Sequence, residues 1–171
     1  MDFDKTNWRY DKINGVNYQI GVVYCTNPVS TNYKSFEIYV PKEYLTCTQS
    51  KRKYTWEINS SGKKDSFTVS TIPFVMPVNT PGYAAMKALT SYDYSTVSKF
   101  IDKGIISLYA GYRGRYEEDS MKFISSALWP VTDLKSAIKY VRYNKNLIPG
   151  DKDKIYTFGM SGCGAQSCLL F

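Results

Sequence analysis

The chain has 171 residues, of which 43% are hydrophobic, 16% aromatic and 22% charged. This composition excludes a disordered chain, and the length suffices for one domain with a core of its own. The net charge of +7 comes from basic residues scattered along the sequence, with one compact run at Lys51-Arg52-Lys53. Because a nucleic-acid-binding surface needs clustered positive charge, the pattern favours a solvated surface over a nucleic-acid partner.

The cysteines and the apolar runs limit the classes of protein further. No two of the four cysteines, Cys25, Cys47, Cys163 and Cys168, have a metal-binding spacing, so no metal or other cofactor is expected. The sequence does not decide whether Cys25 and Cys47 form a disulfide. No apolar run is long enough to span a membrane, and no signal peptide begins at Met1. The location is left open between the cytoplasm and secretion with the leader removed.

The first part of the chain predicts antiparallel strands. Asn14-Gly15 is typical of a tight hairpin turn, and strands are expected over residues 16–25 and 35–40. Residues 47–66 are polar and basic, which predicts a surface insertion with loop character. The apolar run at 71–78 predicts a buried strand, although its two prolines each remove a hydrogen-bond donor from the ladder.

Beyond residue 70 the pattern alternates between strands and helices. Helices are expected at 92–103 and 129–145, strands at 105–110 and 154–158, and a last helix after Ser161. Such alternation predicts parallel strands joined by right-handed crossovers, and hence an α/β fold. In this sequence the last strand is expected at an edge of the sheet.

Residues 155–167 carry the strongest functional signal. A β-prone run, small residues around Ser161 and a helix-forming stretch follow the strand–turn–helix pattern of a nucleophile elbow, which exposes a serine hydroxyl. The N–H of Gly162 comes where a helix begins and its donors are unpaired, so Gly162 is a candidate oxyanion donor. A Gly/Ser-rich turn without chemistry is the alternative, while a phosphate loop is disfavoured because no lysine follows the glycines.

Two further loops follow the ends of predicted strands, where open α/β sheets place binding groups. Gly82 and Tyr83 offer backbone N–H groups in the first loop, which fits a type II turn equally well. Arg113 and Arg115 lie in the second, and a structural role is favoured for them over binding an acidic ligand. Asp133, in the first turn of the next predicted helix, is a candidate partner for either arginine.

The sequence contains no histidine. A serine hydrolase of the usual kind needs a histidine to accept the serine proton, so either Ser161 is inert or the base lies outside this sequence. The last residues, Cys168-Leu169-Leu170-Phe171, are mostly apolar and favour burial. We therefore expect this sequence to be the N-terminal part of a longer chain.

Taken together, the segments resemble the first half of an α/β-hydrolase, and most closely the bacterial tannases and feruloyl-esterase-like carboxylesterases. The resemblance covers roughly residues 36–171 without the stretch 47–66. It rests on residues 38–41, 79–83, 111–115, 133–144, 148–151 and 159–165. The sequence departs from the pattern at Cys163, which replaces the usual glycine, and at Thr80-Pro81, where a more glycine-rich loop is common.

The resemblance implies that residues 1–171 form the N-terminal part of one α/β-hydrolase domain, with a mostly parallel sheet whose first strands are antiparallel. It implies Ser161 as the nucleophile, Gly162 as one oxyanion donor, and Gly82 or Tyr83 as the other. An acidic residue and a histidine are then expected further along, in C-terminal polypeptide that packs on this chain.

The implied activity is that of a serine carboxylesterase, which hydrolyses small carboxylic esters, phenolic-acid esters among them, through an acyl-serine intermediate. A serine peptidase on the same fold is an alternative, since a fold does not fix a substrate. A second alternative is an inactive protein or binding module that keeps only the hydrolase architecture. The 171-residue chain alone is expected to show no turnover.

Overall fold

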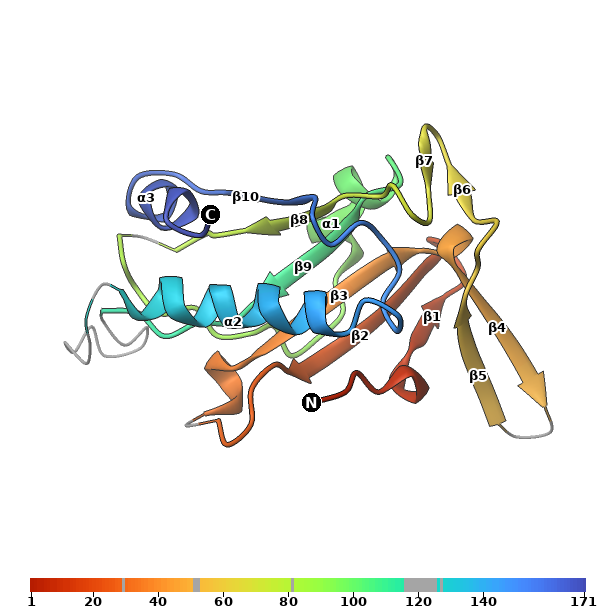
Figure 1. Cartoon of the computed structure of the whole chain (residues 1–171), viewed down its shortest axis with the longest axis horizontal. Coiled ribbons are helices and arrows are strands. Elements are labelled where there is room, and N and C mark those ends of the chain that lie inside the picture. The colour runs from red at the N-terminus through yellow and green to blue at the C-terminus, as the bar shows by residue number, and fades with distance from the viewer. Residues whose placement is uncertain (29, 51–52, 81, 116–125, 127) are drawn as a thin grey trace.

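The chain forms a mixed sheet with helices, shown as a computed structural model in Figure 1. The structure describes residues 1–28, 30–50, 53–80, 82–115, 126 and 128–171. Its main sheet has six strands in the order β1-β2-β3-β9-β8-β10. Two further two-stranded ladders, β4-β5 and β6-β7, lie outside this sheet.

The N-terminal strands form the antiparallel half of the sheet. They are β1 (Arg9–Asp11), β2 (Val16–Val23) and β3 (Ser35–Pro41), and each pairs with the next in antiparallel register. Asp11 pairs with Val16, and Gly15 before it takes φ +64°, a conformation that suits glycine. The predicted turn and both predicted strands are thereby confirmed, with β2 ending two residues earlier than expected.

The other half of the sheet is parallel. It comprises β8 (Phe74–Pro77), β9 (Ile106–Ala110) and β10 (Ile155–Phe158), with β8 between the other two. Because β3 and β9 are antiparallel, the described sheet is mixed, and the expected mostly parallel arrangement holds only for β9, β8 and β10. The expected edge position of the last strand is confirmed, since β10 ends the strand order.

The prolines of β8 fit the sheet because of where their nitrogens face. The N–H groups of Phe74 and Val78 donate to β10, at 2.8 Å each. Alternate residues of a strand turn to opposite neighbours, so the nitrogens of Pro73 and Pro77 face β9. The ladder with β9 extends only to Val75, so the proline at the end of β8 removes no hydrogen bond from it.

Helices lie on both faces of the sheet. They are α1 (Tyr94–Ile101), α2 (Trp129–Tyr143) and the short α3 (Gly162–Cys168). Asp93 caps α1 by accepting a hydrogen bond from the N–H of Ser95 at 2.9 Å, and Pro130 lies in the first turn of α2. Single 3₁₀ turns span Lys5–Asn7 (η1), Thr31–Tyr33 (η2) and Lys42–Tyr44 (η3). None of the described helices is long and apolar enough to cross a bilayer.

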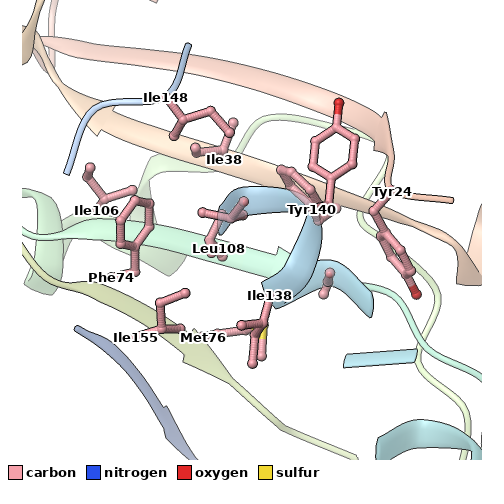
Figure 2. Packing of buried hydrophobic residues seen from close by; sticks show 14 of the residues in the cluster. Tyr24, Ile38, Phe74, Met76, Ile106, Leu108, Ile138, Tyr140, Ile148 and Ile155 are labelled. Carbon is pink, nitrogen blue, oxygen red and sulfur yellow. The ribbon is translucent and has the colours of Figure 1, made fainter. Parts of the chain in front are cut away.

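Alternating side chains of the sheet divide the core into two layers. On one face α2 packs against the central strands, and Figure 2 shows Ile138 and Tyr140 among Ile38, Leu108 and Met76. On the opposite face Val97 and Ile101 of α1 meet Val16 and Tyr39. Each fully buried aliphatic side chain of this kind contributes about 1.5–3 kcal/mol to folding. This packing fixes the strand ends on which the candidate site is built.

The polar stretch at 47–66 is not a simple loop. It belongs to a hairpin of β4 (Leu45–Ser50) and β5 (Lys53–Ile58), which projects from the body in Figure 1, and to a small ladder of β6 (Lys63–Lys64) and β7 (Phe67–Thr68). Trp56 is buried and its ring meets that of Tyr10 at 6.5 Å. The basic run predicted within the loop lies partly outside the described residues.

Candidate active site

Ser161 occupies the turn that joins β10 to α3. Its backbone takes φ 56° and ψ −124°, which residues other than glycine adopt at a cost of about 1–3 kcal/mol. The residue is exposed, and its side chain makes no capping hydrogen bond to the helix that it precedes. The turn therefore presents the serine hydroxyl to solvent in a strained backbone conformation.

Small residues allow the strand and the helix to approach at this turn. A Cβ atom added to Gly159 would lie 2.6 Å from Cβ of Cys163 and 2.6 Å from the carbonyl oxygen of Val78. Contacts of that length do not occur between real side chains and backbone, so only glycine fits at 159. The backbone of the turn is packed against both α3 and the end of β8.

The loop after β8 lies against the first residue of α3. A Cβ atom on Gly162 would meet the carbonyl oxygen of Gly82 at 2.5 Å. Gly82 is exposed at φ +58°, and Tyr83 after it is half-buried. Ser161, Gly162, Gly82 and Tyr83, which the sequence analysis singled out, are thus brought to one place at the ends of β8 and β10. Pro81, part of the predicted type II turn, lies outside the described residues.

Backbone N–H groups at this place have no acceptor within the described chain. Those of Gly162, Gly82 and Tyr83 make no backbone hydrogen bond there. Of the atoms of Gly82, the carbonyl oxygen would come nearest to a Cβ atom added to Gly162.

The loop after β9 supports the loop after β8 from behind. Tyr112 and Met86 exchange backbone hydrogen bonds of 2.8 and 2.9 Å, and the N–H of Arg115 donates to the carbonyl oxygen of Tyr83 at 2.7 Å. A Cβ atom on Gly114 would lie 2.1 Å from the backbone nitrogen of Ala85. The two loops are therefore in direct backbone contact, which a side chain at 114 would prevent.

Arg113 forms an ionic contact with Asp133, which is the fifth residue of α2 and so lies beyond the first helical turn in which the sequence placed it. The carboxylate of Asp133 is fully buried and accepts from Nε and Nη2 of Arg113 at 2.9 and 2.8 Å, and from Nζ of Lys34. Burial acts to raise the pKa of Asp133, but the hydrogen bonds from Arg113 and Lys34 outweigh it and hold the pKa below its usual value. The guanidinium of Arg113 also lies 4.1 Å from the ring centre of Trp129.

Two residues that sequence reasoning did not assign to the site lie beside it. Tyr112 is buried, and its hydroxyl lies 2.9 Å from Oγ1 of Thr80. Thr80 in turn contacts the sulfur of Cys163. These contacts join positions far apart in sequence, and the pattern gave no signal for them. Within the described part of the chain, no group of acidic residues and cysteines is arranged to hold a metal ion.

Comparison with known proteins places this fold beside one class of enzyme. No protein-family profile matches the sequence, and no curated protein matches it. Among solved structures, tannase from Fusobacterium nucleatum is 26% identical with a TM-score of 0.74, covering 97% of this chain and 34% of that one. The native tannin acyl hydrolase from Lactobacillus plantarum is 24% identical with a TM-score of 0.74, covering 96% and 36%.

A tannin acyl hydrolase in complex with ethyl gallate gives a similar result, with 24% identity, a TM-score of 0.68 and coverage of 89% and 32%. The chain thus spans about a third of the length of the tannases that it matches. It has the fold of part of a tannase, which confirms the resemblance to bacterial tannases at the level of the fold.

Proposed function

We propose that this chain carries the nucleophile and the oxyanion-binding groups of a serine ester hydrolase with the α/β-hydrolase arrangement. The observation that carries the proposal is the exposed Ser161 at φ 56°, between a parallel strand and a helix, beside the contact of Gly162 with Gly82. That combination is what a nucleophile elbow requires. The tannase fold of the chain supports an ester as the substrate.

In the proposed reaction, Oγ of Ser161 attacks the ester carbonyl carbon and gives its proton to a general base, and the carbonyl oxygen gains the negative charge. The N–H of Gly162 donates to that oxygen. The second donor is proposed to be the N–H of Gly82 or that of Tyr83, both in the loop that packs against Gly162. Each such donor is worth roughly 10²–10³ in rate. As the intermediate collapses, the protonated base gives the proton to the departing alcohol and an acyl-serine remains. Water then hydrolyses the acyl-serine, which releases the acid and restores the Ser161 hydroxyl.

The base is proposed to come from further polypeptide, because the chain has no histidine. The outer edge of β10 and the adjoining α3 provide a surface for it. Tyr156, Phe158 and Leu169 are exposed there, and a groove runs between β10 and α3. A further strand on this edge would pair the free backbone groups of β10 and bring a histidine with its acidic partner toward Ser161.

Carboxylic esters are the proposed substrates, with phenolic-acid esters among them. The solved tannases include complexes with ethyl gallate and with 3,4-dihydroxybenzoate. A chain of the same fold is therefore tested first on such compounds. Hydrolysis of ethyl gallate is expected to exceed hydrolysis of a matched aliphatic ethyl ester and of a peptide amide.

A fluorophosphonate probe on the full-length gene product tests the proposal. Labelling is expected at Ser161, with loss of both labelling and ethyl gallate hydrolysis in Ser161→Ala. Ser60→Ala, which changes an exposed serine on a distant loop, is the control and is expected to keep both. An unlabelled full-length product would favour the non-catalytic binding module, and hydrolysis of peptides in place of esters would favour the peptidase.

A further inference from the structure

The two positions at which the sequence departs from the hydrolase pattern are in contact. Cys163 lies in the first turn of α3 and is 1% exposed. Its sulfur lies 3.1 Å from the backbone nitrogen of Thr80, whose N–H donates to it. The thiol in turn donates to the carbonyl oxygen of Thr80 across 2.7 Å. One side chain thus occupies both backbone groups of Thr80.

The side chain of Thr80 extends this contact to the loop after β9. Its hydroxyl donates to the carbonyl oxygen of Ala84 at 3.1 Å. A threonine hydroxyl has a single proton, so in its 2.9 Å contact with Tyr112 it accepts, and the tyrosine hydroxyl donates. Tyr112 is fully buried, and burial raises the pKa of its hydroxyl, which keeps the donor protonated. Thr80 is therefore fixed from three sides.

We infer that Cys163 is a positioning residue, which holds Thr80 and thereby fixes the loop that carries the N–H groups of Gly82 and Tyr83 beside Gly162. The inference rests on the proposed function. Besides its contacts with Thr80, the sulfur of Cys163 lies 4.0 Å from the carbonyl oxygen of Gly82. Anchoring the backbone two residues earlier limits the orientations of its peptide.

Only a small polar side chain can serve at position 163. Cys163 is almost fully buried, and a Cβ atom at position 159 would lie only 2.6 Å from its Cβ, so the packing leaves little room for a larger side chain. Serine keeps one donor and one acceptor on the same carbon, whereas alanine keeps the volume near the backbone and removes both. A comparison of Cys163→Ser with Cys163→Ala therefore distinguishes the effect of the hydrogen bonds of Cys163 from the effect of its packing.

Kinetics of the full-length product provide the first test. Cys163→Ala is expected to lower kcat for ethyl gallate about tenfold or more with KM within twofold, because a misplaced donor affects the transition state. Cys163→Ser is expected to keep kcat within threefold. Cys47→Ala, which changes an exposed cysteine on β4, is the control. Equal kcat values for wild type and Cys163→Ala, with Ser161 labelled in both, would overturn the inference.

Amide hydrogen exchange supplies a readout that does not depend on activity. The N–H of Thr80 is expected to exchange at least tenfold faster in Cys163→Ala than in wild type or Cys47→Ala, and near the wild-type rate in Cys163→Ser. Should Cys163→Ala fail to fold, Tyr112→Phe replaces it, with the same expected direction. A wild type that is never labelled at Ser161 would refute the proposed function, whereas unchanged exchange at Thr80 would refute the anchoring.

Discussion

Asp133 binds Arg113 through the backbone as well as the side chain. The N–H of Arg113 donates to Oδ2 at 3.0 Å, next to the two guanidinium contacts. Lys34, the residue before β3, donates to Oδ1. One carboxylate of α2 thereby fixes the loop after β9, on which the loop of Gly82 rests. Backbone contacts between the two loops, together with the side-chain contacts of Tyr112, Thr80 and Cys163, connect this ion pair to the turn of the candidate nucleophile.

Replacing Asp133 is predicted to destabilise the fold. Asp133→Asn leaves two cations without a counter-charge, and breaking a buried pair in this way costs about 3–5 kcal/mol. Because the pKa of Asp133 is lowered, its stabilisation is fully present above the ordinary value of 3.8 and lost as the pH falls through the lowered value. Urea unfolding at pH 7 and pH 3 measures both effects.

The matched control for this prediction is Asp153→Asn, at an exposed aspartate before β10. Its free energy of unfolding is expected to stay within about 0.5 kcal/mol of wild type. An Asp133→Asn protein as stable as wild type at pH 7 would show that the pair contributes nothing to the fold.

Glu37 is predicted to make stability fall as the pH rises. It is fully buried in β3, with Oε2 accepting from the hydroxyl of Tyr39 at 2.7 Å and Oε1 without a partner in the described chain. Burial raises its pKa to about 7, despite the Tyr39 hydrogen bond. The raised pKa means that stability from the neutral acid is fully present below 4.5 and lost as the pH rises through 7.

Glu37→Gln is the test, because glutamine keeps the acceptor and cannot ionise. The variant is expected to be roughly 2 kcal/mol more stable than wild type at pH 8, and about equal to it at pH 5. Chemical unfolding across this range gives the comparison. Glu57→Gln on the exposed hairpin should keep the wild-type pH profile. If the free energy of unfolding of Glu37→Gln depended on pH as that of wild type does, a group other than Glu37 would be responsible for the dependence.

The elements that could be predicted from the sequence are those with one-sided or complete burial. The apolar run of β9 and the helical spacing of α2 both result from contacts with the core, so the sequence pattern predicted both elements. The helix predicted within residues 92–103 begins at Tyr94, where Asp93 caps it. Burial also marked β8, although prolines interrupt it.

The hairpin of β4 and β5 could not be predicted, because β4 is exposed on both faces after Leu45 and shows no alternation. The candidate site could be predicted only in part, for a different reason. The sequence places the loops after β8 and β10 at the same edge, but their contact depends on these strands being neighbours. The bond of Cys163 to Thr80 spans 83 residues, and nothing local indicates it.

Gly114→Ala is predicted to disrupt the support of the candidate site. The added methyl would lie 2.1 Å from the nitrogen of Ala85 and 2.2 Å from the carbonyl carbon of Ala84, and neither backbone atom can yield cheaply. A loss of about 3 kcal/mol or more in the free energy of unfolding is expected. Gly21→Ala is the control, since open space surrounds that position and only its φ of +71° penalises alanine, by about 1–2 kcal/mol. Equal losses in the two variants would contradict the close approach of the loops.

Substitutions at Ser161 are predicted to separate the backbone strain of the turn from its chemistry. Glycine adopts φ 56° and ψ −124° without a Cβ clash, whereas alanine keeps the strain that serine bears. Replacing the strained residue by glycine relieves about 1–3 kcal/mol of backbone strain. This gain exceeds the roughly 0.5–1 kcal/mol by which glycine destabilises a fold through its greater backbone entropy in the unfolded chain. Ser161→Gly should therefore unfold at higher urea concentration than Ser161→Ala, by about 1 kcal/mol in free energy, while both lack fluorophosphonate labelling. If Ser161→Gly were the less stable of the two, the turn would be unstrained, and the geometric basis for a nucleophile at this position would be lost.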